Sequence, residues 1–137
     1  MACAPAPGAG PSLTDARGTF YAETAFVFPT LDAGDHTHFR KVGTRLAQAI
    51  SKVVLGARVR LVDGVVTEAR IAYGSVGPVP LRCPATEGAL VGLKSKEFLA
   101  AAAHVSTDIK PIDDVRSTAD YRLRVAARVL RSWLVTL

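Results

Sequence analysis

The stretch ISKVVLGARVRLVDGVVTEARIAYGSV, residues 50–76, constrains the fold most strongly. It consists of two runs rich in β-branched residues on either side of Asp63-Gly64, a dipeptide typical of a tight β-turn. A two-residue turn would pair Val59 with Glu68 and would mix apolar and charged side chains on both faces. We therefore predict a three-residue loop, Val62-Asp63-Gly64, with Gly64 in the left-handed position of a β-bulge.

This register gives the hairpin one charged face and one apolar face, because side chains alternate along each strand. We expect opposite charges to pair on the charged, solvent-exposed face, and the apolar face to pack against helices. The predicted pairs are Arg58 with Glu68, Ala57 with Ala69 and Leu55 with Ile71, and Tyr73 extends the apolar face.

Two helices are predicted soon after the hairpin. The first covers residues 84–92, PATEGALVG, with proline in its first turn and glycine at its end. The second covers residues 95–109, with Ser95 as its N-cap. It ends there because the residue before Pro111 disfavours the helical region.

A third helix is predicted from Ser117 or Thr118 to the C-terminal region. Apolar residues recur every four positions along it, which indicates a stripe that faces the core. The stripe consists of Tyr121, Val125, Val129 and Trp133, with Ala126, Leu130 and Leu134 beside it, whereas Arg124, Arg128 and Arg131 lie opposite.

The order of the elements, strands first and helices after, predicts an α+β fold: an antiparallel sheet of three or four strands packed on one side by three helices. Its first strand is expected in TFYAETAFVFP, residues 19–29, followed by a loop over residues 30–38, TLDAGDHTH. Residues 1–17, rich in Ala, Pro and Gly, are predicted to be a flexible leader, and residues 18–137 a single domain.

Composition limits the classes of function. No apolar run approaches the roughly 18 residues that cross a bilayer, so no membrane contact is expected. The net charge of +5 suits nucleic acid, but no aromatic residues interleave with the basic ones, so no nucleic-acid partner is expected. Cys3 and Cys83 are too few for a disulfide framework, and the N-terminus does not resemble a secretory signal, which favours a cytoplasmic location. A homo-oligomer stays an open alternative.

Residues with possible chemistry also have structural interpretations. His36 and His38 could bind a metal ion, but no third ligand stands at a recognisable spacing, so no metal is expected. Asp113 and Asp114 could perform acid–base chemistry. Their place just before a helix favours a structural role at its N-terminus. Cys83 is expected to behave as a small apolar residue.

Five ordered segments resemble one family. They are TAFVFP, FRKVGTRLAQAISKVV, DGVVTEARIAYGSVGPVPLR, ATEGALVG and IKPIDDVRSTADYR. In this order they resemble the C-terminal domain of the FAD subunit of the molybdenum hydroxylases, a group that includes the xanthine dehydrogenases and the carbon monoxide dehydrogenase flavoprotein. The resemblance covers about Thr24 to Leu137. It implies three or four strands with three helices, in agreement with the fold predicted from the pattern.

The resemblance implies a role in a flavin enzyme. In this family an N-terminal domain with glycine-rich loops holds most of the FAD, and the C-terminal domain closes over the isoalloxazine ring. Lys41 matches a lysine that contacts the flavin, and residues 42–52 match a loop beside it. The expected cofactor-binding residues are therefore Lys41, Thr44 and Arg45, whereas no catalytic residue is implied. A cation there would stabilise the anionic reduced flavin.

The resemblance also implies partners, namely an FAD-holding domain or chain and iron–sulfur and molybdenum subunits. The chain is then expected to aid electron transfer to an acceptor without being catalytic alone.

The sequence departs from the family in two ways. It lacks the glycine-rich FAD-holding domain and has no Gly-x-Gly-x-x-Gly segment. Glu23 stands where the family usually has an aliphatic residue against the flavin, and a carboxylate buried there would need a partner. Two alternatives remain: a free-standing domain of this fold that binds or converts another small molecule, for example in biosynthesis, and an interaction module for an acidic partner.

Overall fold

The computed structural model describes residues 13–15, 18–20, 30–45 and 49–137. The chain forms two compact units, Met1–Leu31 and Asp32–Leu137, which are described separately. In the first unit, strands β1 (Leu13–Asp15) and β2 (Gly18–Phe20) pair in antiparallel fashion. The strand predicted over residues 19–29 overlaps the end of β2, and residues 21–29, including Glu23, lie outside the described residues.

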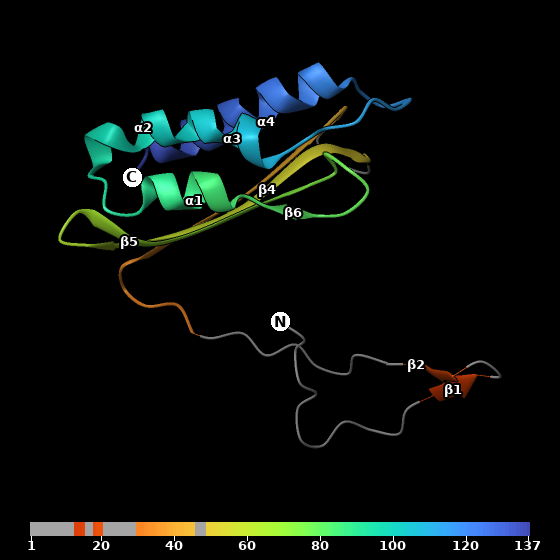
Figure 1. Ribbon diagram of the computed structural model, residues 1–137, viewed down its shortest axis with the longest axis horizontal. Coiled ribbons are helices and arrows are strands. Elements are labelled where there is room, and N and C mark those ends of the chain that lie inside the picture. Colours follow the sequence, from red (N-terminus) through yellow and green to blue (C-terminus); the bar gives the residue numbers. More distant parts are fainter. Residues whose placement is uncertain (1–12, 16–17, 21–29, 46–48) are drawn as a thin grey trace. The chain divides into compact units, whose positions relative to one another are not determined.

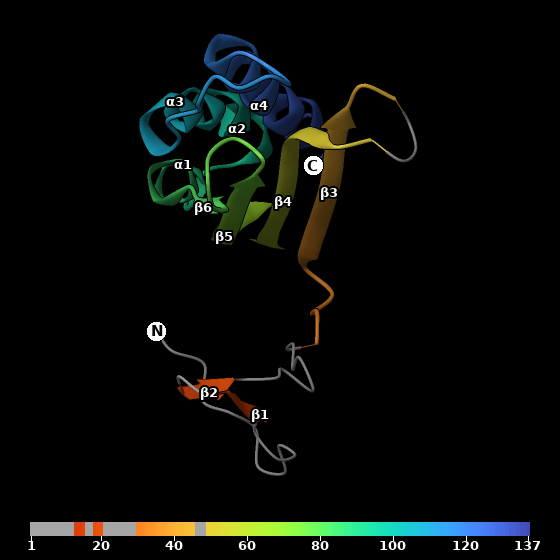
Figure 2. The ribbon, with the colours of Figure 1, turned by 90° about the vertical axis from the view of Figure 1, so that its right-hand side faces the viewer.

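The second unit is a four-stranded antiparallel sheet with helices on one side (Figure 1). The strands β3 (Asp35–Gly43), β4 (Ser51–Val62), β5 (Val65–Gly74) and β6 (Leu81–Arg82) neighbour one another in this order. The turned view shows the helices gathered beside β4 and β5, with β3 at the far edge of the sheet (Figure 2). The predicted α+β class is confirmed.

Two of the predicted helices form as expected. α1 (Pro84–Leu90) begins with proline, and α4 (Ala119–Leu134) begins after Thr118, whose hydroxyl accepts a hydrogen bond from the backbone N–H of Tyr121. Both starts were predicted from the residues that favour a first helical turn.

The predicted helix over residues 95–109 is instead a series of short turns. These are η1 (Ser95–Glu97), α2 (Phe98–Ala101), η2 (Ala102–His104) and α3 (Val105–Asp108), where η marks a 3-10 helix. The N-cap is Lys94 rather than Ser95, because the Glu97 carboxylate accepts a hydrogen bond from the Lys94 backbone N–H. The segment ends at Ile109 as predicted, where the backbone becomes extended.

The β4–β5 hairpin has a two-residue turn, so the predicted three-residue loop is wrong. Val62 pairs with Val65, and Asp63 and Gly64 form the turn between them. Both turn residues have positive φ, 52° for Asp63 and 73° for Gly64. This combination matches the right-handed twist of the strands, and aspartate and glycine tolerate it best.

A β-bulge beyond the turn explains why a two-residue turn does not mix apolar and charged side chains on the two faces. The register shifts between Arg60 and Leu61, which leaves Thr67 as an additional residue on β5. The predicted partners are therefore wrong by two positions, but an even shift leaves each side chain on its predicted face. The observed pairs are Arg60 with Glu68, Arg58 with Arg70, Ala57 with Ile71 and Leu55 with Tyr73.

β3 lies where no strand was predicted. Residues 30–38 were expected to form a loop, but the strand starts at Asp35 and includes His36 and His38. The His38 ring stacks on Trp133 of α4, with ring centroids 5.4 Å apart and 10° between the planes. Pairing with β4 and this stacking hold the segment extended, although its composition is typical of turns.

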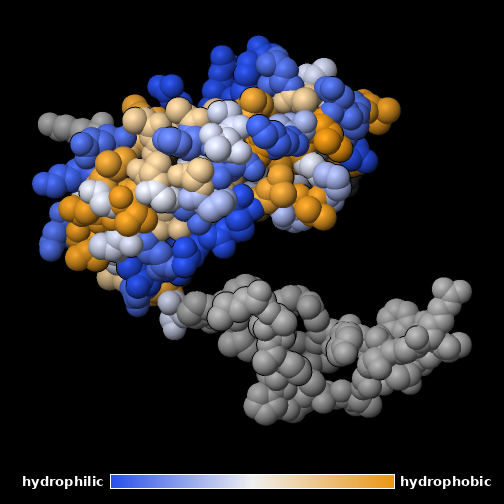
Figure 3. All heavy atoms as spheres, in the orientation of Figure 1, coloured by the Kyte–Doolittle hydropathy of each residue, from blue (hydrophilic) through white to orange (hydrophobic). Residues whose placement is uncertain are grey.

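The core lies between the helices and the apolar face of β4 and β5. Tyr73 is fully buried there, and its hydroxyl donates to the carbonyl oxygen of Ala126 at 2.8 Å. On the visible surface of this unit, apolar and hydrophilic residues are interspersed (Figure 3). The predicted hairpin face, Leu55, Ala57, Ile71 and Tyr73, is buried, as are Arg122, Ala126, Leu130, Trp133 and Leu134 of α4, whereas Tyr121, Val125 and Val129 are half-buried.

α1 takes the place of a strand along the outer edge of β5. β6 has only two residues, and they pair with Ala72 and Tyr73 of β5. The backbone N–H of Ile71, the residue before this pairing, therefore needs another acceptor. Glu87 Oε1 accepts it at 2.7 Å, and the carboxylate also accepts from Arg82 at 2.9 and 2.7 Å. Backbone pairing with β5 resumes at Val66, after α1 has ended. A buried carboxylate thus replaces a backbone acceptor.

We expect Glu87→Ala to lower the free energy of unfolding by about 2–4 kcal/mol, because it leaves the buried Ile71 N–H without an acceptor and Arg82 without its partner. Glu87→Gln keeps one acceptor oxygen and should lose less. The control is Asp120→Ala, which removes a carboxylate that is 74% exposed and forms a surface pair with Arg124, and it should lose less than about 1 kcal/mol. Urea unfolding followed by circular dichroism measures all three, and equal losses for the two alanine variants would contradict the role of Glu87.

Candidate functional site

The connection between β3 and β4 forms a hollow, here called the loop cavity. β3 ends at an irregularity where the register shifts between Val42 and Gly43. Glycine is favoured there by space, because a Cβ on Gly43 would lie 3.3 Å from both the Ala49 Cβ and the Ile50 carbonyl oxygen. The loop cavity has a volume of ≈ 400 Å³ and is lined by Thr44, Arg45, Ala49, Ile50, Lys52, Val115 and Arg116.

The loop cavity combines apolar and cationic side chains. Ile50 is 64% exposed and Val115 is fully exposed, so both offer apolar surface to a ligand or partner. Arg45, Lys52 and Arg116 contribute positive charge, and the Lys52 Nζ lies 5.2 Å from the ring centroid of Tyr121. This surface suits a flat, largely apolar group that carries negative charge.

An ion pair between a buried arginine and an exposed aspartate holds the wall that carries Arg116. Arg122 Nη2 lies 2.6 Å from Asp114 Oδ2, and Nη1 donates to the Ile112 carbonyl oxygen at 3.1 Å. The Arg122 side chain is only 3% exposed. Asp114 also accepts hydrogen bonds from the backbone N–H groups of Arg116 and Ser117. The Arg122 hydrogen bond above all, with these backbone bonds, lowers the pKa of Asp114.

Asp113 and Asp114 therefore have the structural role that was predicted for them. Asp113 Oδ1 accepts a hydrogen bond from the Ala119 N–H at 2.6 Å, at the start of α4. Sequence reasoning missed Arg122, although a signal was present. It stands four residues before Ala126 on the buried side of α4, where a charged side chain needs a partner.

The structure brings together two of the three predicted site residues. Thr44 and Arg45 both line the loop cavity, but Lys41 does not. Lys41 pairs with Val54, whose neighbours Val53 and Leu55 are buried on the helical side, so Lys41 points to the other side of the sheet. It is exposed there and makes no hydrogen bond or ion pair with any described residue.

We call the side of the sheet that points away from the helices the open face. Its residues stand in four rows across the strands, and two rows are mainly charged whereas two are mainly small or apolar. The rows are Asp35, Arg60 and Glu68; Thr37, Arg58 and Arg70; Phe39, Gly56, Ala72 and Arg82; and Lys41, Val54 and Gly74.

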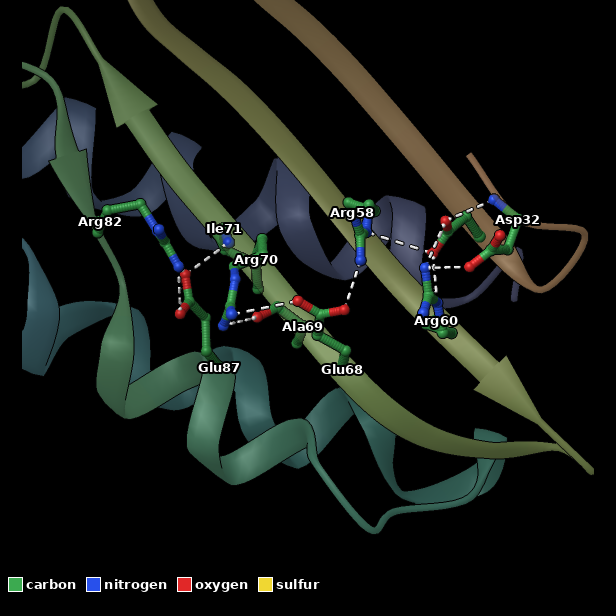
Figure 4. Close-up of polar contacts among 10 residues, drawn as sticks. Asp32, Arg58, Arg60, Glu68, Ala69, Arg70, Ile71, Arg82 and Glu87 are labelled. Carbon is green, nitrogen blue, oxygen red and sulfur yellow. Dashed lines mark hydrogen bonds and ion pairs between the residues drawn. The ribbon is translucent and has the colours of Figure 1, made fainter. Parts of the chain in front are cut away.

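Asp35 is the centre of an ion-pair array in the charged rows (Figure 4). Its side chain is shielded from solvent, with 0% exposed. Arg60 donates to both carboxylate oxygens, at 3.0 and 3.1 Å, and Arg58 Nε lies 3.2 Å from one of them. The hydrogen bond from Arg60, followed by that from the Asp32 backbone, lowers the pKa of Asp35 to about 2. The remaining ion pairs are Arg60–Asp32, Arg58–Glu68 and Arg70–Glu68.

A second hollow, the α1 groove, lies where the charged rows meet α1. It has a volume of ≈ 620 Å³ and includes Arg60 and Arg70 from the strands and Glu87 and Gly88 from α1. Each of its charged side chains is already in an ion pair within the domain. The α1 groove therefore offers little charge to a ligand.

The other reactive residues are not arranged for chemistry. Cys83 is buried, and desolvation above all raises the pKa of its thiol to about 12, so little thiolate exists at neutral pH. Over residues 13–15, 18–20, 30–45 and 49–137, no group of three or more His, Cys, Asp and Glu residues could hold a metal ion. In the same part of the chain, no helix combines the length and the apolar character needed to cross a membrane.

Comparison with known proteins identifies one family. The family described as the CO dehydrogenase flavoprotein C-terminal domain matches residues 38–137. A search of curated protein sequences gave no match.

Three solved structures share the fold. Carbon monoxide dehydrogenase from Hydrogenophaga pseudoflava, lacking the Mo-pyranopterin moiety of its cofactor, has a TM-score of 0.68 at 26% identity, over 76% of this chain and 37% of that one. Quinoline 2-oxidoreductase from Pseudomonas putida 86 has a TM-score of 0.67 at 19% identity, over 91% and 50%. Reconstituted CO dehydrogenase from Oligotropha carboxidovorans has a TM-score of 0.69 at 21% identity, over 88% and 49%. The chain thus matches half or less of each of these chains.

The low pKa of Asp35 predicts how the stability of the sheet depends on pH. A carboxyl group with a depressed pKa in the folded state stabilises it above the unfolded pKa of about 3.9, and this contribution is lost as the pH falls through about 2. Asp35→Asn should therefore lower the melting temperature at neutral pH, and its deficit relative to wild type should shrink between about pH 4 and pH 2. Asp63→Asn at the exposed turn is the control and should show no such trend. A deficit for Asp35→Asn that does not change with pH would contradict the assignment.

Proposed function

Because the chain belongs to the family of CO dehydrogenase flavoprotein C-terminal domains, we propose that it acts in a flavin-dependent oxidoreductase. In this role it closes over the isoalloxazine ring of an FAD that is held by another domain or chain. The observation that carries the proposal is the loop cavity, where apolar and cationic side chains meet at the connection between β3 and β4.

The residues of the loop cavity fit a flavin ring. An isoalloxazine is flat and largely apolar, and its reduced form carries negative charge. Ile50 and Val115 offer exposed apolar surface, and Arg45 and Lys52 offer positive charge. The fit is to the ring alone, because the sequence has no Gly-x-Gly-x-x-Gly segment to take the pyrophosphate. The remainder of the cofactor requires a second polypeptide segment.

When bound, FAD supplies the redox chemistry that amino acid side chains lack. The contribution of this chain is electrostatic and steric. With a flavin ring in the loop cavity, Arg45 and Lys52 would place positive charge near the ring, and Ile50 and Val115 would keep water from it. The buried Arg122 fixes the wall of the loop cavity in advance, so that less reorganisation accompanies the reaction.

The three predicted cofactor residues act from two surfaces in this proposal. Thr44 and Arg45 line the loop cavity and would contact a ring bound there. Lys41 lies two residues before Gly43 and points to the open face, so it reaches the ring only if the ring extends past the end of the sheet. This arrangement is consistent with a ring held between this domain and a partner.

The partners in this proposal follow from the length of the chain. The chain covers 37%, 49% and 50% of the three solved chains, so an equal or greater length of each has no counterpart in it. We propose that this portion, which holds the FAD, is supplied by a separate domain or chain. Iron–sulfur and molybdenum subunits would deliver the electrons to the flavin.

The test mixes the full chain with the FAD-loaded remainder of the Hydrogenophaga pseudoflava flavoprotein, cut where its match to this chain begins. We expect the chain to tighten FAD binding, and Arg45→Ala and Lys52→Ala each to weaken it about fivefold, the loss expected for one partly exposed charge contact. Both variants should also lower the midpoint potential of the flavin, because less positive charge faces the reduced ring. Lys41→Ala tests its contribution in the same way.

Arg128→Ala, on the exposed side of α4, is the matched control and should leave both quantities unchanged. FAD affinity that is the same with and without the chain would reject the proposal. It would favour the alternative of a free-standing domain that binds another small molecule, which mass spectrometry of the purified chain would detect.

A further inference from the structure

The α1 groove contains a part of the outer edge of β5 that no described strand covers. Along an antiparallel strand, the backbone groups of alternate residues point to opposite edges. The N–H of Ile71 points to Glu87, and the C=O of Ile71 accepts from the Cys83 N–H at 2.9 Å, so Ile71 faces the outer edge. Ala69 stands two residues earlier and therefore presents its N–H and C=O at the same edge, in the lining of the groove.

The backbone of Ala69 is only partly satisfied within the domain. No described residue accepts a hydrogen bond from its N–H, although Ala69 is only 2% exposed. Its C=O accepts from Arg70 Nη1 at 3.4 Å, a long distance for such a bond (Figure 4). A buried N–H without an acceptor is unfavourable, and most buried backbone groups in proteins have a partner. Ala69 therefore offers a free donor and a weakly bonded acceptor to a ligand in the groove.

The strand that follows β5 in the chain does not reach Ala69. β6 pairs Leu81 with Tyr73. This antiparallel register, if continued, would place Ala85 opposite Ala69. Ala85 instead lies in α1, where its N–H donates to Asp108 Oδ1 at 2.9 Å. The turn of the chain into α1 therefore leaves Ala69 without the strand residue that the register would have placed opposite it.

Gly88 provides a second and independent observation. It lies in α1, is exposed and lines the groove. A Cβ on Gly88 would meet no atom within 4 Å, and its φ is not positive, so neither packing nor backbone conformation requires glycine. Glycine is unfavourable inside a helix, because it loses more backbone entropy on folding than other residues. Its missing side chain leaves room beside α1 for the close approach of another backbone.

The charged side chains of the groove indicate a neutral ligand. Each of them already forms an ion pair within the domain, so a neutral ligand can cover them without leaving an unpaired charge. They are Arg60, Glu68, Arg70 and Glu87. A charged ligand would lose its hydration without finding a free counter-charge. Pro84 and Val91, at the two ends of α1, are exposed and offer apolar contact.

We propose that the α1 groove binds a short, neutral segment of a partner protein in an extended conformation. In an antiparallel sheet, one residue exchanges two N–H···O bonds with the residue opposite, and Ala69 offers both groups for such an exchange. Pro84 and Val91 contact apolar side chains of the segment. The groove volume of ≈ 620 Å³ limits the segment to a few residues. The inference does not depend on the flavin, because the α1 groove shares no lining residue with the loop cavity.

The first experiment titrates the isotope-labelled full chain with capped trialanine, a neutral peptide, and follows the backbone amides by NMR. The amide proton of Ala69 should shift downfield in a saturable manner, because its N–H gains an acceptor. That of Ile71 should shift less, because Glu87 already accepts its N–H. The same peptide with every amide nitrogen methylated keeps its carbonyl groups but has no N–H, and it should bind about fivefold more weakly. No saturable shift at Ala69, or equal affinity for the two peptides, would overturn the inference.

The second experiment fills the groove. Gly88→Leu should weaken peptide binding about tenfold and leave the melting temperature unchanged or higher, because leucine favours helices and the Cβ has room. Ala100→Leu, at an exposed position of α2 outside the groove, is the matched control and should bind like wild type. Val91→Ser removes an exposed apolar contact and should weaken binding about threefold. Wild-type affinity in both groove variants, or tighter binding of a capped peptide with a central aspartate, would contradict the proposal.

Discussion

One additional residue in β5 is the constraint on which the second unit depends. Side chains alternate along a strand, so a single inserted residue moves all those beyond it to the opposite face. Thr67 is that residue, and it follows a turn of only two residues. Without it, the apolar residues of β4 and β5 would be divided between the two faces. The core and the open face are therefore two results of the same irregularity.

Carboxylates that accept several hydrogen bonds organise the helical side in a similar way. Glu87 accepts the Ile71 N–H where β6 has ended, and so joins α1 to the edge of β5. Asp108 accepts hydrogen bonds from two N–H groups at the start of α1 and from the Thr86 hydroxyl, which joins α3 to α1. Asp114 does the same for the segment before α4, through Arg122. Each acid replaces a backbone acceptor that the local fold does not provide.

The sequence was sufficient where structure is decided locally, and insufficient where distant residues decide it. The starts of α1 and α4 depend on proline and threonine at their first turns, and both were predicted. The loop predicted over residues 30–38 is partly strand, because His38 packs on Trp133, far away in the sequence. The predicted hairpin turn was wrong because the bulge was placed in the loop, at Gly64, whereas the additional residue is Thr67, beyond a two-residue turn. At the candidate site, Lys41 and Arg45 are neighbours in sequence, yet the alternation of β3 and the irregularity at its end place them on different surfaces.

The position of β3 has a bearing on solubility. It is the outermost strand of its sheet, and an outer strand can recruit the backbone of another molecule. Its exposed side chains include Arg40 and Lys41, which place positive charge along this edge. Two such edges repel each other when they align. The positive charge on β3 thus discourages two copies of this domain from extending one sheet into the other through this strand.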